Sequence, residues 1–123
     1  MGEPDQQFSP RPFEVEVQRT AATAHVKVCG ELDLLTAPRL QEALDAVLAQ
    51  GVRHVILDLR ELDFIDSTGM RIVYNLDHLS RQDGFNAAIV RGGPDVQRAF
   101  TIAGLAESFV FVDQPEDLAS PGD

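Results

Sequence analysis

Cysteine, tryptophan and basic residues are scarce in this chain of 123 residues, which has one cysteine (Cys29), no tryptophan and only 10 lysines and arginines. A single cysteine cannot form an intramolecular disulfide, and we interpret Cys29 as a buried thiol in a strand. The 20 acidic residues give a formal net charge of −10. This charge repels phosphate backbones and anionic lipids, so it argues against nucleic-acid and membrane binding and favours a cationic or zwitterionic protein partner.

Long apolar runs and metal-ligand patterns are also missing. No run approaches the roughly 18 apolar residues of a transmembrane helix. The first residues lack the positive and apolar regions of a signal peptide, so we expect a cytoplasmic protein. The three histidines are widely spaced, with no cysteine pair or His-x-x-x-His pattern, and we therefore expect no metal and no other cofactor.

The hydrophobic pattern predicts one α/β domain over residues 13–118, between flexible tails at 1–12 and 119–123. Period-two alternation predicts an opening hairpin, apolar runs predict further strands, and apolar residues at helical spacing predict the helices. The predicted strands are 13–17, 24–28, 52–59, 86–90 and 109–112. The predicted helices are 36–51, 71–81 and 94–104, with a short one at 115–119. This order implies one mixed sheet of about five strands, mostly parallel after the hairpin, with about four helices.

Two loops follow the carboxyl ends of predicted strands, where open α/β sheets place their ligand sites. One loop is residues 30–33, which lead to a predicted helix N-cap at Thr36, and the other is residues 63–69. We expect Asp33, Asp66 and Ser67 to lie near one another at this edge. Ser67 stands at a helix start, where unpaired N–H groups and the helix macrodipole tolerate negative charge.

Ser67 has several possible roles on the local sequence. No Gly-x-x-x-x-Gly-Lys or Gly-x-Gly-x-x-Gly pattern occurs, which disfavours a nucleotide-binding enzyme. The stretch Ile65-Asp66-Ser67-Thr68-Gly69 lacks the glycine that precedes a hydrolase nucleophile by two positions, and no histidine is a good candidate base, which disfavours a hydrolase. Two roles stay open: a simple helix N-cap, and a phosphorylation site that changes the charge of an interface.

Three sequence motifs occur in an order and at a spacing that are typical of one protein family. They are Gly30-Glu31-Leu32-Asp33-x-x-Thr36-Ala37, then Leu57-Asp58-Leu59 running to Phe64-Ile65-Asp66-Ser67-Thr68-Gly69-Met70, and finally Pro94-x-Val96-x-Arg98-x-Phe100 before Gly104-Leu105. Together they resemble the STAS domain of bacterial anti-sigma factor antagonists, over roughly residues 13–118. The resemblance implies the STAS fold.

The resemblance also implies a regulator and not an enzyme. Members of this family bind an anti-sigma factor that is also a serine kinase, and thereby free a sigma factor. The kinase phosphorylates the serine that matches Ser67, which stops binding, and a serine phosphatase restores it. The implied surface for the partner and kinase is Asp33, Thr36, Asp66, Ser67, Thr68, Gly69, Met70 and Arg71.

Two positions depart mildly from the family pattern. Met70 replaces the common leucine, and Arg71 replaces a residue that is usually glycine. Arg71 lies one turn inside the helix, where it can alter partner choice or pair with a phosphate on Ser67. The alternative function is a STAS subunit of a lipid-transport or stress-sensing complex. We expect a monomer or a weak homodimer.

Overall fold

The computed structural model describes residues 11–119. Its strands are β1 (Glu14–Thr20), β2 (Thr23–Leu32), β3 (His54–Asp58), β4 (Leu62–Ile65), β5 (Asn86–Val90) and β6 (Phe111–Val112). Its helices are α2 (Ala37–Ala49), α3 (Ser67–Asp83), α4 (Pro94–Ile102) and α5 (Glu116–Ala119). The predicted tails lie outside the described residues, apart from residues 11, 12 and 119.

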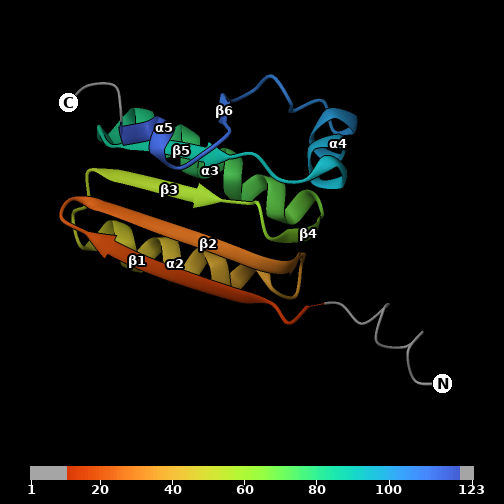
Figure 1. Ribbon diagram of the computed structural model, residues 1–123, viewed down its shortest axis with the longest axis horizontal. Helices are drawn as coiled ribbons and strands as arrows, with labels where there is room; N and C mark the ends of the chain where they lie inside the picture. The colour runs from red at the N-terminus through yellow and green to blue at the C-terminus, as the bar shows by residue number, and fades with distance from the viewer. Residues whose placement is uncertain (1–10, 120–123) are drawn as a thin grey trace.

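The six strands form one mixed sheet. Its strands follow the order β1-β2-β3-β5-β6, and β4 pairs with β2 off this path. β1 and β2 form the predicted antiparallel hairpin, whereas β2–β3, β3–β5, β5–β6 and β2–β4 are parallel pairs. Figure 1 shows β3 ending beside the middle of the long β2, with β4 continuing alongside it.

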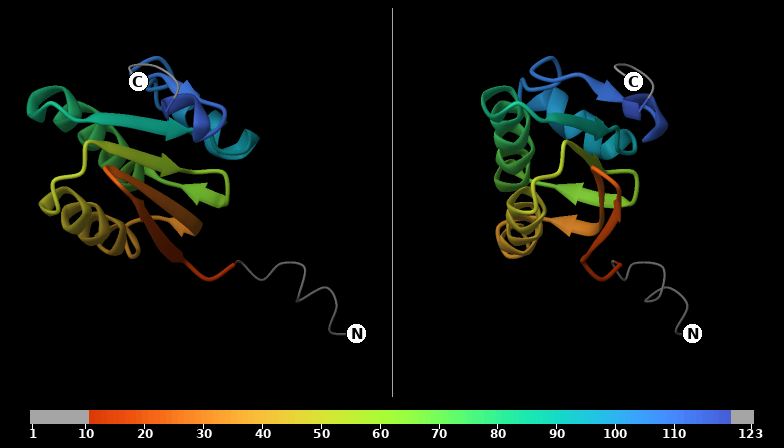
Figure 2. Two further views of the ribbon diagram at one scale, coloured as in Figure 1. Left: turned by 60° about the vertical axis from the view of Figure 1, so that its left-hand side comes forward. Right: turned by 90° about the vertical axis from the view of Figure 1, so that its left-hand side faces the viewer.

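Helices cover the sheet unequally. Figure 2 shows α2 and α3 packed side by side on one face, with the short α5 on the opposite face. Alternate residues of β2 point toward the α2–α3 layer, and Ala24, Val26 and Val28 are completely buried there. All apolar residues of β3 are buried, as its continuous apolar run requires of a central strand covered on both faces.

The main correction concerns the segment before Ser67, which we expected to be a loop at 63–69. Residues 62–65 instead form β4, a sixth strand, which pairs with Glu31 and Leu32 of β2. Leu62 and Ile65 are buried while the two residues between them are exposed, so the segment lacks period-two alternation. The missing alternation is the reason why the sequence did not reveal the strand.

Several element boundaries also differ from the prediction. Helix α3 begins at Ser67, four residues before the predicted start at Arg71, because the polar first turn carries no apolar periodicity. The predicted strand 52–59 shortens to β3, and the predicted strand 109–112 shortens to β6. Phe109 lies outside β6 and is buried in an edge-to-face contact with Phe100, with ring centroids 5.6 Å apart.

Candidate functional site

The prediction of a loop at 30–33 is wrong for residues 30–32, which extend β2 and pair with β4. This pairing brings the segment 30–33 and the segment 63–69 together at one end of the sheet. The backbone N–H of Asp66 donates to the carbonyl of Leu32 at 3.1 Å. The backbone N–H of Leu34 donates to Oδ2 of Asp66 at 3.2 Å. The loop that follows β2, which contains Asp33, therefore lies against the start of α3 and Ser67.

The Asp66 carboxylate organises the start of α3. Asp66 is the N-cap of α3, and its Oδ1 accepts from the backbone N–H of Gly69 at 3.0 Å. Ser67 is the first helical residue, so the interpretation of Ser67 as the N-cap is wrong. The Ser67 side chain is exposed and Thr68 is half-buried. The serine hydroxyl is therefore accessible to a partner and is not needed to cap the helix.

Gly69 and Met70 face the core. A Cβ on Gly69 would lie 2.7 Å from Cγ of Leu32 and 2.9 Å from Cγ1 of Ile65, so only glycine lets α3 approach β2 and β4 this closely. Met70 is 6% exposed. Both residues were predicted to contribute to a binding surface, and the structure places them beneath it.

Asp33 and Thr36 hold the loop before α2. Oδ1 of Asp33 accepts from the backbone N–H groups of Leu35 and Thr36 at 3.0 and 3.1 Å. Thr36 Oγ1 accepts from the backbone N–H of Asp33 at 2.9 Å and donates to the carbonyl of Glu31 at 2.8 Å. Thr36 occupies the N-cap position of α2 as predicted, but its side chain makes no cap hydrogen bond. These side chains thus fix the shape of the loop.

Three large apolar side chains are exposed next to Ser67. Leu34 and Leu35, in the loop held by Asp33 and Thr36, are 69% and 85% exposed, and Phe64 of β4 is 48% exposed. We call Leu34, Leu35 and Phe64 the apolar surface. Large exposed apolar side chains on two segments that meet in this way are typical of a protein-binding site. Sequence reasoning missed it, although two adjacent leucines in a loop were an available signal.

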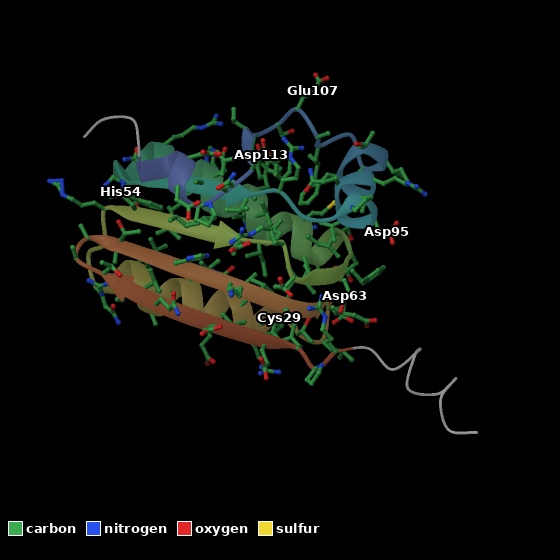
Figure 3. All side chains as sticks on the ribbon, viewed as in Figure 1. Cys29, His54, Asp63, Asp95, Glu107 and Asp113 are labelled. Carbon is green, nitrogen blue, oxygen red and sulfur yellow. The ribbon has the colours of Figure 1, made fainter. Side chains whose placement is uncertain are left out.

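The chain before β1 is fastened at this same end. The Arg11 guanidinium donates to Oε1 of Glu61 and Oδ1 of Asp63, each at 2.7 Å, and to the Glu61 carbonyl at 2.6 Å. The hydrogen bond from Arg11 lowers the pKa of Asp63. Gly30, with φ +90°, allows the backbone of residues 11–13 to pass, because a Cβ there would lie 3.0 Å from three of its atoms. Figure 3 shows Asp63 at this end, with His54 at the other.

A buried carboxylate lies on the opposite face of the sheet from α2 and α3. Asp58, which is fully buried, accepts from Arg60 Nε and Nη2 at 3.0 and 2.8 Å, and lies 2.8 Å from His25 Nε2. Burial raises the Asp58 pKa, but the hydrogen bonds from Arg60 and His25 outweigh burial and lower it to about 2. His25 is therefore engaged in this network.

The described part of the chain offers neither a metal site nor a membrane span. Within residues 11–119, no three or more His, Cys, Asp or Glu side chains are grouped so that they could hold a metal ion. None of the helices in that range is both long enough and apolar enough to cross a membrane.

Comparison with known proteins identifies the fold. The model of the STAS domain family matches residues 14–118, which include every strand and almost all of the helical residues. The chain belongs to the STAS domain family. Both the predicted family and the predicted mixed α/β STAS fold are thereby confirmed, with six strands in place of about five.

Relatives of this STAS domain are anti-sigma factor antagonists. The chain is 32% identical over 82 residues to the anti-sigma-B factor antagonist of Staphylococcus aureus (strain NCTC 8325 / PS 47), covering 67% of this chain and 76% of the relative. It is 28% identical over 94 residues to the anti-sigma F factor antagonist of Paenibacillus polymyxa, covering 76% and 80%. The crystal structure of an anti-sigma factor antagonist from Mycobacterium paratuberculosis superposes with a TM-score of 0.74 at 26% identity, covering 94% of this chain and 98% of that one.

Proposed function

We propose that this STAS domain is an anti-sigma factor antagonist that binds an anti-sigma factor with serine-kinase activity and is switched off by phosphorylation at Ser67. The observation that carries the proposal is the exposed Ser67 hydroxyl at the start of α3, beside the apolar surface. The relatives support the class of partner. The protein acts as a regulator in the cytoplasm, and a serine phosphatase resets it.

The apolar surface provides the contact energy in this proposal. Leu34, Leu35 and Phe64 lose their exposed area when the anti-sigma factor docks, and each fully buried side chain of this size contributes about 1.5–3 kcal/mol. Asp33 and Thr36 keep the two leucines in place through the loop hydrogen bonds. Their contribution to binding is therefore preorganisation, which reduces the entropy lost on association.

Phosphorylation acts at the edge of this surface. Ser67 Oγ attacks the γ-phosphorus of ATP held by the kinase, ADP leaves, and the hydroxyl proton passes to a kinase base. The product adds a charge of about −1.5 to −2 and three hydrated oxygens beside the apolar surface. The start of α3 tolerates this charge, since helix N-termini favour anions. The phosphate therefore weakens docking of the partner and leaves the fold unchanged.

The test begins with candidate anti-sigma kinases and ATP, followed by mapping of the modified residue by mass spectrometry. We expect phosphate on Ser67 and none on Thr68. In calorimetry with that kinase, Ser67→Ala should bind as tightly as the native chain and Ser67→Asp much more weakly. Equal affinity of the two variants would contradict the switch. Loss of binding in Leu35→Ser, with Val110→Ser as a control that is equally exposed at 83%, tests the apolar surface.

The alternative function makes a different prediction. A chain that no anti-sigma kinase modifies, and that copurifies with a transporter permease, would instead be a STAS subunit of a lipid-transport assembly. Sedimentation of the isolated chain tests the expected monomer or weak homodimer.

A further inference from the structure

The exposed face of α3 continues from Ser67 as a single stripe. At 3.6 residues per turn, positions 67, 71, 74 and 78 fall within a sector about 60° wide. Arg71 and His78 are exposed and Tyr74 is 45% exposed, whereas the opposite side of the helix is buried in the core. The stripe of Arg71, Tyr74 and His78, which we call the α3 stripe, therefore borders Ser67 directly.

The α3 stripe is aromatic and cationic. The rings of Tyr74 and His78 stack with an interplanar angle of 5° and centroids 6.3 Å apart. Among the described residues, carboxylates pair with Arg11, Arg60, Arg81 and Arg91, whereas Arg71 forms no ion pair. Nothing acidic occurs between Asp66 and Asp77, and Asp77 is held by Arg81 at 2.8 Å. Arg71 is thus a local cation on a chain of net charge −10.

We propose that the α3 stripe is part of the partner-binding surface and takes an acidic segment of the protein partner, with Arg71 as the residue that pairs with its carboxylates. Tyrosine and arginine are the residue types enriched at the centres of protein interfaces. The stripe also continues the apolar surface around Ser67, so one partner can cover both. The net charge of −10 favours a cationic partner overall, but Arg71 is a local cation with no carboxylate partner among the described residues, so charge complementarity with a short acidic segment fixes the register of docking there. The identity of the partner rests on the proposed function.

Arg71 also connects this contact to phosphorylation. Positions 67 and 71 are four residues apart on one helix, where side chains of opposite charge meet. A phosphate on Ser67 is a strong acceptor for a guanidinium and competes with the carboxylates of the partner for Arg71. Phosphorylation therefore removes a cation from the interface as well as adding an anion.

The first test needs no partner. Phosphoserine is incorporated genetically at position 67, and the second pKa of the phosphate is followed by phosphorus NMR. We expect Arg71→Ala to raise that pKa by about 0.1–0.4 at low salt, and 1 M NaCl to abolish the difference. Arg53→Ala, the same charge change at the opposite end of the sheet, should leave it unchanged. An identical pKa in the native chain and Arg71→Ala would overturn the competition for Arg71.

The second test is calorimetry with the kinase that phosphorylates Ser67. We expect Arg71→Ala to bind about 10-fold and Arg71→Glu about 100-fold more weakly, while Arg53→Ala binds as the native chain does. Native affinity in Arg71→Glu overturns the proposal for the α3 stripe, even if Ser67→Asp fails to bind. The two variants therefore distinguish failure of this proposal from failure of the phosphorylation switch. If Arg71→Glu instead alters the sedimentation of the isolated chain, the stripe contacts a second copy and the acidic-partner proposal is wrong.

Discussion

Asp58 is the ionisable side chain whose stability contribution can be worked out most directly. Its carboxylate is fully buried and bonded to Arg60 and His25, and its pKa falls from the ordinary 3.8 to about 2. A difference of nearly two pKa units corresponds to about 2 kcal/mol of folding free energy. Because the folded pKa is depressed, this contribution is fully present above about pH 5 and is lost as the pH falls through the ordinary pKa of 3.8 to below about 2.

The perturbation is Asp58→Asn, which keeps the shape and removes the charge. At pH 7 we expect the free energy of unfolding to fall by about 2–4 kcal/mol, since Arg60 and His25 lose their charged partner. The Arg60 side chain is 45% exposed, and water can solvate it in the variant. We therefore expect the loss of stability to lie near the lower end of this range. The other carboxylates also titrate in acid, so the informative quantity is the difference between the two proteins.

The assay is urea unfolding at pH 7, 5, 4 and 3. The difference in stability between native chain and variant should be constant above pH 5 and should shrink as the pH falls below 4. Asp113→Asn is the matched control, because Asp113 pairs with Arg91 at 3.0 Å but is 75% exposed, and surface pairs contribute about 0–1 kcal/mol. A stability difference for Asp58→Asn that is independent of pH, or equal to that of the control, refutes the reasoning.

Three further expectations follow from single contacts. Gly69→Ala should lower the free energy of unfolding by about 1–2 kcal/mol in thermal melts, since overpacking against Leu32 outweighs the helix propensity of alanine, and an unchanged melting temperature contradicts it. Asp66→Ala should cost about 0.5–2 kcal/mol in urea unfolding through loss of the α3 cap, with Asp95→Ala as an exposed control on α4. Cys29 lies in β2 as predicted but is half-buried, not buried. Its partial burial, together with the nearby charge of Glu61, raises the pKa of the thiol, so alkylation at pH 7 should be slower than for a free thiol, and equal rates would contradict this.

Local sequence patterns were sufficient to predict the class of fold and the position of Ser67 at a helix start. Alternation in residues 13–17 and 24–28, an apolar run ending in Leu57-Asp58-Leu59, and amphipathic helices specified the α/β order. These signals depend on neighbours within a few residues, which is why they can be read from the chain alone. The motif around Ser67 placed it correctly at a helix start.

Tertiary structure decided what surrounds that serine. The pairing of β4 with β2 joins residues about thirty positions apart. Asp63 and Phe64 are both exposed, so β4 lacks the alternating pattern that would predict a strand. Only this pairing sets Leu34 against the Asp66 carboxylate and leaves Asp66, not Ser67, to cap α3. The bonds of Arg11 to Asp63 and of His25 to Asp58 span 52 and 33 residues in the same way. Such contacts depend on chain closure and packing of the whole sheet. The sequence therefore determined the place of Ser67 at a helix start, and the tertiary structure determined which side chains surround it.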